Sequence, residues 1–275
     1  MGKSGLLVSL AVLLLAGCSM TRLAYDNADT FLRWQANNYF DFEGEAAVEL
    51  DRRIAAFLAW HRPKALPEYA RFAEEASRRL LRGIKRDDLD WGYDAFRAQI
   101  RGALGVAASE MAPLLDGLSA AQIAHLERRL AEDNRRFAKE QLQGTVEERS
   151  QRRFKRNLTR LEEWYGPLTD EQAGLVRRYA RSPLYVELHD RDRKRRQAEL
   201  VAMLRAREAR KKLVAWAQDW EGGREPAFAK AARANREAYY ELLLELDSTL
   251  SPEQRRAAAG RMSEYGATFA SLARK

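Results

Sequence analysis

The three histidines are the first side chains to consider for catalysis or metal binding. His61, His125 and His189 are about 64 residues apart, so no two of them share a helix turn. A zinc-binding helix of the H-E-x-x-H type needs two histidines four residues apart on one face. The sequence contains no G-x-S-x-G elbow, P-loop or dinucleotide-binding glycine pattern. We therefore expect no metal, no cofactor, no small-molecule substrate and no enzymatic activity.

His61 is the one histidine with catalysis as an alternative role. It lies between Trp60 and Arg62 at an expected helix end, where a local hydrogen bond or a contact with the helix terminus is the simpler role. An enzyme of unknown type remains the alternative. It would require His61 to face carboxylates in a pocket.

Two basic clusters could contact an anionic partner. The candidate residues are Arg152, Arg153, Lys155 and Arg156 in one cluster and Arg193, Lys194, Arg195 and Arg196 in the other. The run 191–196 winds through almost two helix turns, so its charges point in several directions. Nearby acids, Glu187, Asp190 and Glu199, favour a solvated helix face. The alternative is contact with anionic lipid headgroups or with an acidic protein.

The N-terminus has the layout of a secretory signal. Lys3 is followed by an apolar stretch from Leu6 to Ala16 and by small residues before Cys18. A helix needs roughly 20 apolar residues to cross a bilayer, and this stretch is shorter. Residues 1–17 are therefore predicted to be an export signal that is removed. Export also argues against a nucleic-acid partner for the basic clusters.

Cys18 is the only cysteine, so no intramolecular disulfide is possible. The preceding Leu15-Ala16-Gly17 resembles, with Cys18, the lipobox of bacterial lipoproteins. The resemblance implies cleavage before Cys18 and a covalent lipid on its thiol, which anchors the chain to a membrane; two or three acyl chains hold a protein stably. Ser19, rather than Asp, resembles the signal for transfer to the outer membrane in Gram-negative bacteria. The alternative is an ordinary signal peptide followed by a free thiol.

The composition predicts an all-α protein. Of 275 residues, 46% are hydrophobic and 32% charged, and the formal net charge is +8. Ala, Leu, Glu, Arg and Lys outnumber the β-branched residues that suit strands. We expect an elongated bundle of about ten helices joined by short turns. Residues 18–24 would be a lipidated tether and residues 25–275 a single domain, with a possible waist near residues 222–223.

Capping patterns predict where several helices begin. The segments 118–122, 168–172 and 250–254 each read Leu, Ser or Thr, two residues, then Gln. Such a capping box lets the hydroxyl and the Gln side chain satisfy two free backbone amides. Thr145 with Glu148 is a fourth box. The other expected helices span about 68–81, 87–115, 182–222 and 226–246, with a break at residues 63–67.

Two family resemblances follow from these residues. The first family resemblance rests on the lipobox, residues 25–29 with Trp34, residues 60–62 with Leu66, Pro67 and Tyr69, and the Leu-Ser/Thr-x-x-Gln helix starts. Together they resemble an uncharacterised proteobacterial lipoprotein family, domain of unknown function 6279. That resemblance implies location and helicity but no activity. The Leu-Ser/Thr-x-x-Gln motifs alone are similar to those of the Spy/CpxP periplasmic chaperones, although any well-capped helix would use the same residues.

These observations favour a non-catalytic lipoprotein that is anchored to the outer membrane and faces the periplasm. Its helical surface is expected to bind other proteins, in a chaperone-like or envelope-assembly role. The alternative is a structural envelope protein that contacts anionic lipid or peptidoglycan.

Overall fold

The computed structural model describes residues 18–181 and 185–274. The predicted signal 1–17 and the expected helix start at residues 182–183 lie outside the described residues. The part that is described consists of helices and short turns without any strand, which confirms the all-α prediction. None of these helices is long and apolar enough to cross a membrane.

The elements follow one another along the chain with short connections. They are α2 (Cys18–Asp26), α3 (Ala28–Phe40), α4 (Gly44–Trp60), η1 (His61–Ala65), α5 (Leu66–Arg82), α6 (Arg86–Asp116), α7 (Ala120–Phe137), η2 (Ala138–Leu142), α8 (Val146–Tyr165), α9 (Asp170–Ala180), α10 (Val186–Arg205), α11 (Ala209–Gln218), α12 (Pro226–Thr249) and α13 (Pro252–Ala273). The two η elements are single π-helical turns.

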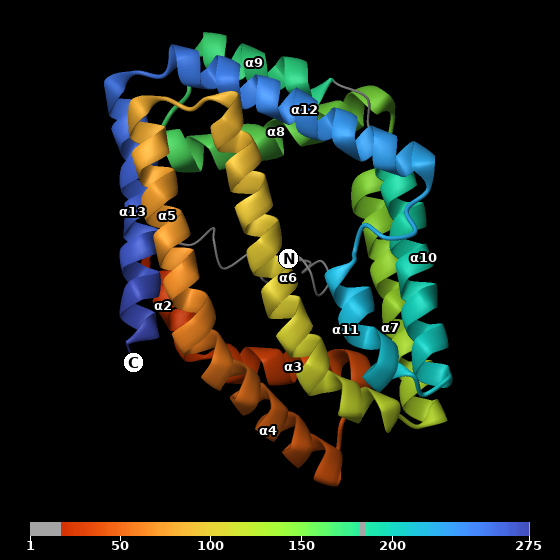
Figure 1. Cartoon of the computed structure of the whole chain (residues 1–275). Coiled ribbons are helices and arrows are strands. Elements are labelled where there is room, and N and C mark those ends of the chain that lie inside the picture. Colours follow the sequence, from red (N-terminus) through yellow and green to blue (C-terminus); the bar gives the residue numbers. More distant parts are fainter. Residues whose placement is uncertain (1–17, 182–184, 275) are drawn as a thin grey trace.

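The helices form a four-sided frame with one helix across its middle (Figure 1). Helices α5 and α13 pack together along one side, and α7, α10 and α11 form the opposite side. Helices α8, α9 and α12 make the top in this view, while α3 and α4 make the bottom. Helix α6 crosses the frame and packs against α11 and α4.

Three separate hydrophobic clusters stabilise this frame. The largest joins α3, α4, α6, α7, α10 and α11 around the fully buried Leu50, Leu126 and Leu204. The second joins α8, α9, α12 and α13 around Val176 and Leu246. A small third cluster packs α2 onto α5 and α13. Apolar burial is thus spread over the junctions of the frame, where several helices meet, rather than gathered in one central core.

The break expected at residues 63–67 does not occur, because the chain passes from α4 to α5 through the π turn η1. The amide of Leu66 donates to the carbonyl of His61, five residues earlier. Proline lacks an amide hydrogen and ordinarily interrupts the hydrogen-bond pattern of an α-helix. The wider turn accommodates Pro63, and Pro67 sits in the first turn of α5, where proline is tolerated.

The single long helix expected over residues 182–222 is wrong, because the chain forms α10 and α11 with a sharp turn between them. Arg207 has a left-handed φ of 54°. The carboxylate of Asp116, at the end of α6, accepts from the backbone amide of Ala209 at 2.6 Å. This cap comes from a distant part of the chain, and it lets α11 fold back onto α6.

All four predicted capping boxes are present. Ser119, Thr145, Thr169 and Ser251 each accept from the backbone amide three residues later, and the Gln or Glu at that position accepts from the amide of the capping residue. The glutamine amides make further bonds beyond their own helices. Gln122 Nε2 donates to the carbonyls of Phe40 and Asp41, at the end of α3.

The other two glutamines bind each other. Gln172 Nε2 donates to Gln254 Oε1, and Gln254 Nε2 donates to Gln172 Oε1, both at 2.9 Å. Each Nε2 also donates to a backbone carbonyl, of Thr249 or of Pro167, and each Oε1 also accepts from the amide of its own capping residue. Both amides therefore use all four of their hydrogen-bonding positions. This pair joins the α8–α9 turn to the α12–α13 turn.

Candidate protein-binding surfaces

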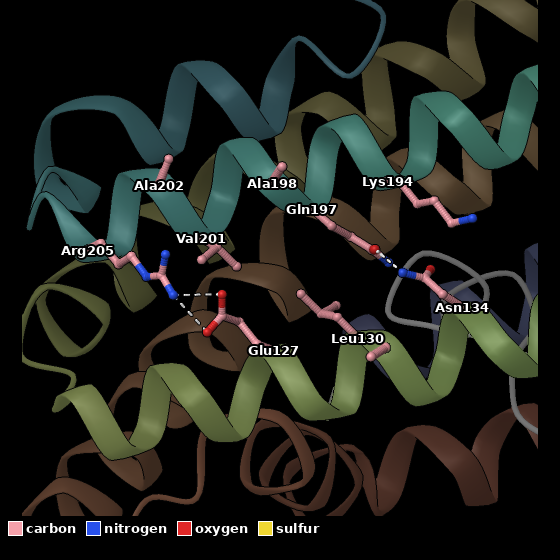
Figure 2. A pocket seen from close by; sticks show the side chains of 10 residues that line it. Glu127, Leu130, Asn134, Lys194, Gln197, Ala198, Val201, Ala202 and Arg205 are labelled. Carbon is pink, nitrogen blue, oxygen red and sulfur yellow. Dashed lines mark hydrogen bonds and ion pairs between the residues drawn. The ribbon is translucent and has the colours of Figure 1, made fainter.

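An open groove runs between α7 and α10, on the side of the frame opposite α5 and α13 (Figure 2). The residues that give it an apolar surface are Leu130 and Ala131 from α7 and Ala198, Val201 and Ala202 from α10. Together with the polar lining residues at positions 127, 134, 194, 197 and 205, they follow the three- and four-residue spacing that places side chains along one face of each helix. Its volume is about 400 Å³. The three alanines keep the groove open, because their side chains are too short to fill the space between the helices.

Polar pairs across the groove hold the two helices together (Figure 2). Arg205 donates from one guanidinium nitrogen to both carboxylate oxygens of Glu127, at 2.8 and 2.9 Å. Further along, Asn134 Nδ2 donates to Gln197 Oε1 at 2.8 Å. Since these polar groups satisfy each other, an apolar side chain could enter the groove between them without leaving a buried polar group unpaired.

The basic run of α10 is largely used inside the protein. Arg193 donates to Asn134 of α7 and lies 4.5 Å from the centroid of the Phe137 ring. Arg196 stacks on Trp216 at 3.9 Å and donates to the carbonyl of the same residue at 2.7 Å. Arg195 donates to Asp192 and, at 3.1 Å, to the carbonyl of Gly222. These three arginines bind α10 to α7, to α11 and to the turn before α12.

The acids near this run were expected to balance it. Lys194 pairs with Asp190 at 2.6 Å, and Arg195 also pairs with Glu199. The third acid, Glu187, instead accepts from Arg149 of α8 at 2.7 Å. Of the four candidate residues 193–196, only Lys194 is exposed, and it borders the groove.

The basic cluster of α8 divides between the inside and the outside of the molecule. Arg153 is buried, donates to Asn235 at 2.6 Å and stacks over Tyr179 at 4.2 Å. Lys155 and Arg156 are exposed, and Arg152 is half-buried. Of the four predicted residues, three thus remain at the surface.

Arg152 and Arg156 line a second, wider depression, which we call the basic depression. Its remaining lining residues are Arg136, Lys139, Glu140, Gln141, Gln143, Gly144 and Glu148, from the end of α7, from η2 and from the start of α8. Its volume is about 790 Å³. Four basic side chains face two acidic ones here, so the surface is electropositive.

His61 lies in an aromatic environment. Its Nδ1 is 3.1 Å from the hydroxyl of Tyr25, and the rings of Phe57 and Tyr69 lie 5.4 and 5.5 Å from its own. Burial lowers the pKa of His61 to about 4, so its ring is neutral at pH 7. The described side chains include no group of three histidine, cysteine, aspartate or glutamate residues placed to hold a metal ion.

Cys18 is the first residue of α2, and its side chain lies outside the described residues. The expected tether 18–24 is part of this helix, which packs against α13. Arg22 donates to the hydroxyl of Ser271 at 2.7 Å, and Thr21 is buried. The chain is therefore already attached to the frame within one turn of Cys18.

Sequence reasoning did not identify the groove or the part of the basic depression that comes from α7 and η2. The apolar residues of α7 and α10 that line the groove do follow helical spacing, and this signal was available. Arg136 and Lys139 gave no such signal, because only the turn through η2 brings them opposite α8.

Comparison with other proteins gives one match. No curated protein and no solved structure matches the chain. A family model described as a family of unknown function, DUF6279, matches residues 38–221, which is more than half of the 275 residues. The chain therefore belongs to the DUF6279 family.

Proposed function

We propose that this chain is a non-catalytic lipoprotein of the bacterial outer membrane that faces the periplasm and binds other proteins in a chaperone-like or envelope-assembly role. The observation that carries the proposal is the groove between α7 and α10, which has an apolar surface and polar side chains that hydrogen-bond to each other. The lipobox-like residues before Cys18 support the anchor.

The groove suits apolar side chains of another polypeptide. Burying apolar surface contributes roughly 25 cal/mol per Å², and the contribution does not depend on which apolar side chain is buried. A shallow site of this kind can therefore accept different sequences, as a chaperone or assembly factor must. A site for one small molecule usually adds polar groups that converge on the ligand, whereas the polar groups of this groove bind each other.

The position of the groove is compatible with a membrane anchor. Helix α2, which begins at Cys18, lies on one side of the frame, and α7 and α10 lie on the other (Figure 1). A lipid attached to Cys18 would leave the groove away from the point of attachment and open to a protein partner.

The proposal can be tested with the full-length chain, purified in a non-ionic detergent, by light scattering of an unfolded client protein. Ala198→Trp should fill the groove, because Ala198 is exposed on α10 and lines it. Ala257→Trp is the matched control, since Ala257 is exposed on α13, outside the groove.

Wild-type protein and the Ala257→Trp variant should both suppress aggregation at similar molar ratios, and Ala198→Trp should require several-fold more protein. If wild-type protein fails to suppress aggregation even in excess, the chaperone-like role is wrong. Equal activity of all three proteins would show that clients bind elsewhere than the groove.

A further inference from the structure

Three arginines form a stripe along α8 beside the basic depression. Arg152, Arg156 and Arg160 follow one another at intervals of four residues, so they share one face of the helix. Each step advances about 6 Å along the helix axis. Arg136 and Lys139 line the opposite side of the depression, from the end of α7 and from η2.

The charges of this region are poorly compensated. The carboxylate of Glu148 belongs to the capping box, where it accepts from the amide of Thr145 at 2.7 Å. It forms no ion pair with the basic side chains of the depression among the described residues. Arg136 pairs with Asp133, and Arg152 donates to a backbone carbonyl. Among the described residues, Lys139, Arg156 and Arg160 have neither an ion pair nor a hydrogen bond from their charged groups.

The environment of Arg156 reflects the excess of positive charge. Desolvation by the surrounding side chains and, after it, repulsion from Arg160, Arg152 and Arg153 lower the pKa of Arg156. An anionic group placed here would relieve that repulsion. The basic run of α10 differs, because its arginines already bind carboxylates, carbonyls and aromatic rings of neighbouring helices.

We propose that the basic depression and the α8 stripe bind an extended, acidic segment of a partner protein, with carboxylates on alternate residues. Side chains at positions i and i+2 of an extended chain lie on one side, about 6.6 Å apart. This spacing is close to the 6 Å step between successive arginines of the stripe. Guanidinium groups also bind carboxylates through paired hydrogen bonds, which are stronger than neutral ones.

The shape and position of the site favour a protein segment over a membrane surface. The basic depression is a hollow between η2 and α8, into which a single extended chain can enter. The connection from α7 to α8 lies at the upper right of Figure 1, whereas α2, which carries Cys18, lies at the left. The stripe is therefore remote from the proposed lipid anchor.

This inference rests on the proposed protein-binding function and names the chemistry of one partner. The test uses the full-length chain in a neutral detergent and fluorescence anisotropy of two labelled peptides of equal composition. One peptide alternates glutamate with serine, and the other gathers its glutamates in one block. The variant Arg156→Glu with Arg160→Glu removes the stripe. The control, Lys230→Glu with Arg261→Glu, makes the same change in net charge at exposed positions of α12 and α13.

Wild-type protein should bind the alternating peptide several-fold more tightly than the block peptide. The stripe variant should lose on the order of tenfold or more in affinity, because it replaces two attractions with two repulsions. The control variant should stay within about twofold, and binding should weaken with salt, since exposed charges are screened beyond about 10 Å at 0.1 M.

Equal loss of affinity in both variants would overturn the proposal, because net charge alone would then explain binding. Equal binding of the two peptides would also overturn it. So would binding of anionic vesicles of phosphatidylglycerol and phosphatidylcholine through the stripe, if neither peptide binds. Suppression of client aggregation by a protein that binds neither peptide would reject only this inference. Failure of that suppression with retained peptide binding would reject the groove instead.

Discussion

At the scale of single residues, burial rather than charged neighbours determines the pKa of His61. The sequence suggested a local hydrogen bond at a helix end, but the partner of His61 is Tyr25, in a different helix. Aromatic rings of α4 and α5 surround the imidazole. Because burial disfavours the charged ring, the pKa of His61 falls to about 4, below the ordinary value of 6.5.

This shift predicts that lowering the pH destabilises the protein already at pH values above those at which carboxylates titrate. In the unfolded chain His61 binds a proton near pH 6.5, whereas in the folded chain it does so near pH 4. The stability that neutral His61 provides is therefore present at pH 7 and is lost as the pH falls through the unfolded pKa. Between pH 7 and pH 5 the free energy of unfolding should fall by about 2 kcal/mol. Urea unfolding at several pH values measures this loss.

The matched variant is His61→Phe, which keeps an aromatic ring but cannot titrate. Its free energy of unfolding should be lower than that of the wild type at pH 7, because the bond to Tyr25 is lost. Its pH dependence should nevertheless be flatter by about 2 kcal/mol over the same range. The same pH dependence in both proteins would show that His61 does not carry the effect.

At the scale of elements, the capping boxes connect helices as well as begin them. The residue after the box at 250–254 is the charged Arg255, whereas the apolar Ile123 follows the box at 118–122. The guanidinium of Arg255 binds Asp247 at 2.7 Å and the carbonyl of Leu80 at 3.1 Å, which fastens the α12–α13 turn to the end of α5. The paired amides of Gln172 and Gln254 join the same turn to α9.

The amide pair predicts energetic coupling between two turns that are distant in the sequence. Gln172→Ala and Gln254→Ala should each lower the free energy of unfolding by about 2 kcal/mol, because each removes a cap and leaves partners unpaired. The double variant should lose about 1 kcal/mol less than the sum, since the bonds between the two amides are counted twice. Chemical denaturation of the four proteins completes this cycle.

Gln122 supplies the control for that cycle. It makes the same box in α7, but its amide binds the end of α3 rather than another glutamine. Gln122→Ala combined with Gln172→Ala should therefore be additive within about 0.5 kcal/mol. Additivity in the Gln172 and Gln254 cycle as well would mean that the bonds between their amides contribute nothing measurable.

At the scale of the whole molecule, α2 connects the frame to Cys18, the proposed site of the anchor. This helix starts at Cys18 and packs against α13, while the family match covers residues 38–221, in the rest of the frame. If Cys18 carries lipid, the short path from the acylated thiol to a packed helix keeps the frame close to the membrane. The side on which α7 and α10 lie would then face away from the point of attachment.

The proposed anchor predicts the fate of the Cys18→Ala variant. Without a thiol there is no site for thioether attachment, so the precursor should stay uncleaved or be mislocalised, and it should not incorporate labelled fatty acid. Metabolic labelling followed by membrane fractionation measures both. Ser19→Asp is the control that keeps the thiol: it should be labelled normally and should move from the outer to the inner membrane fraction. Normal processing and fractionation of Cys18→Ala would reject the lipoprotein proposal.

Much of the local structure could be predicted from the sequence, because its signals lie within a few residues of each other. Helical composition, the four capping boxes and the helix starts near residues 120, 146, 170 and 252 all follow from neighbouring side chains. The prediction of a break at Pro63 is wrong for a local reason, because a π turn accommodates a proline that an α-helix does not.

Only the tertiary structure decided which of these elements meet and which charged residues remain available. The turn after α10 depends on Asp116, which comes from α6, and the amide pair joins residues 172 and 254. The two basic clusters look alike in the sequence, yet neighbouring helices bind most of the α10 run and leave Arg156 and Arg160 of the α8 stripe exposed. The physical reason is that hydrogen bonds and packing act between atoms that are close in space, and their partners here come from distant parts of the chain.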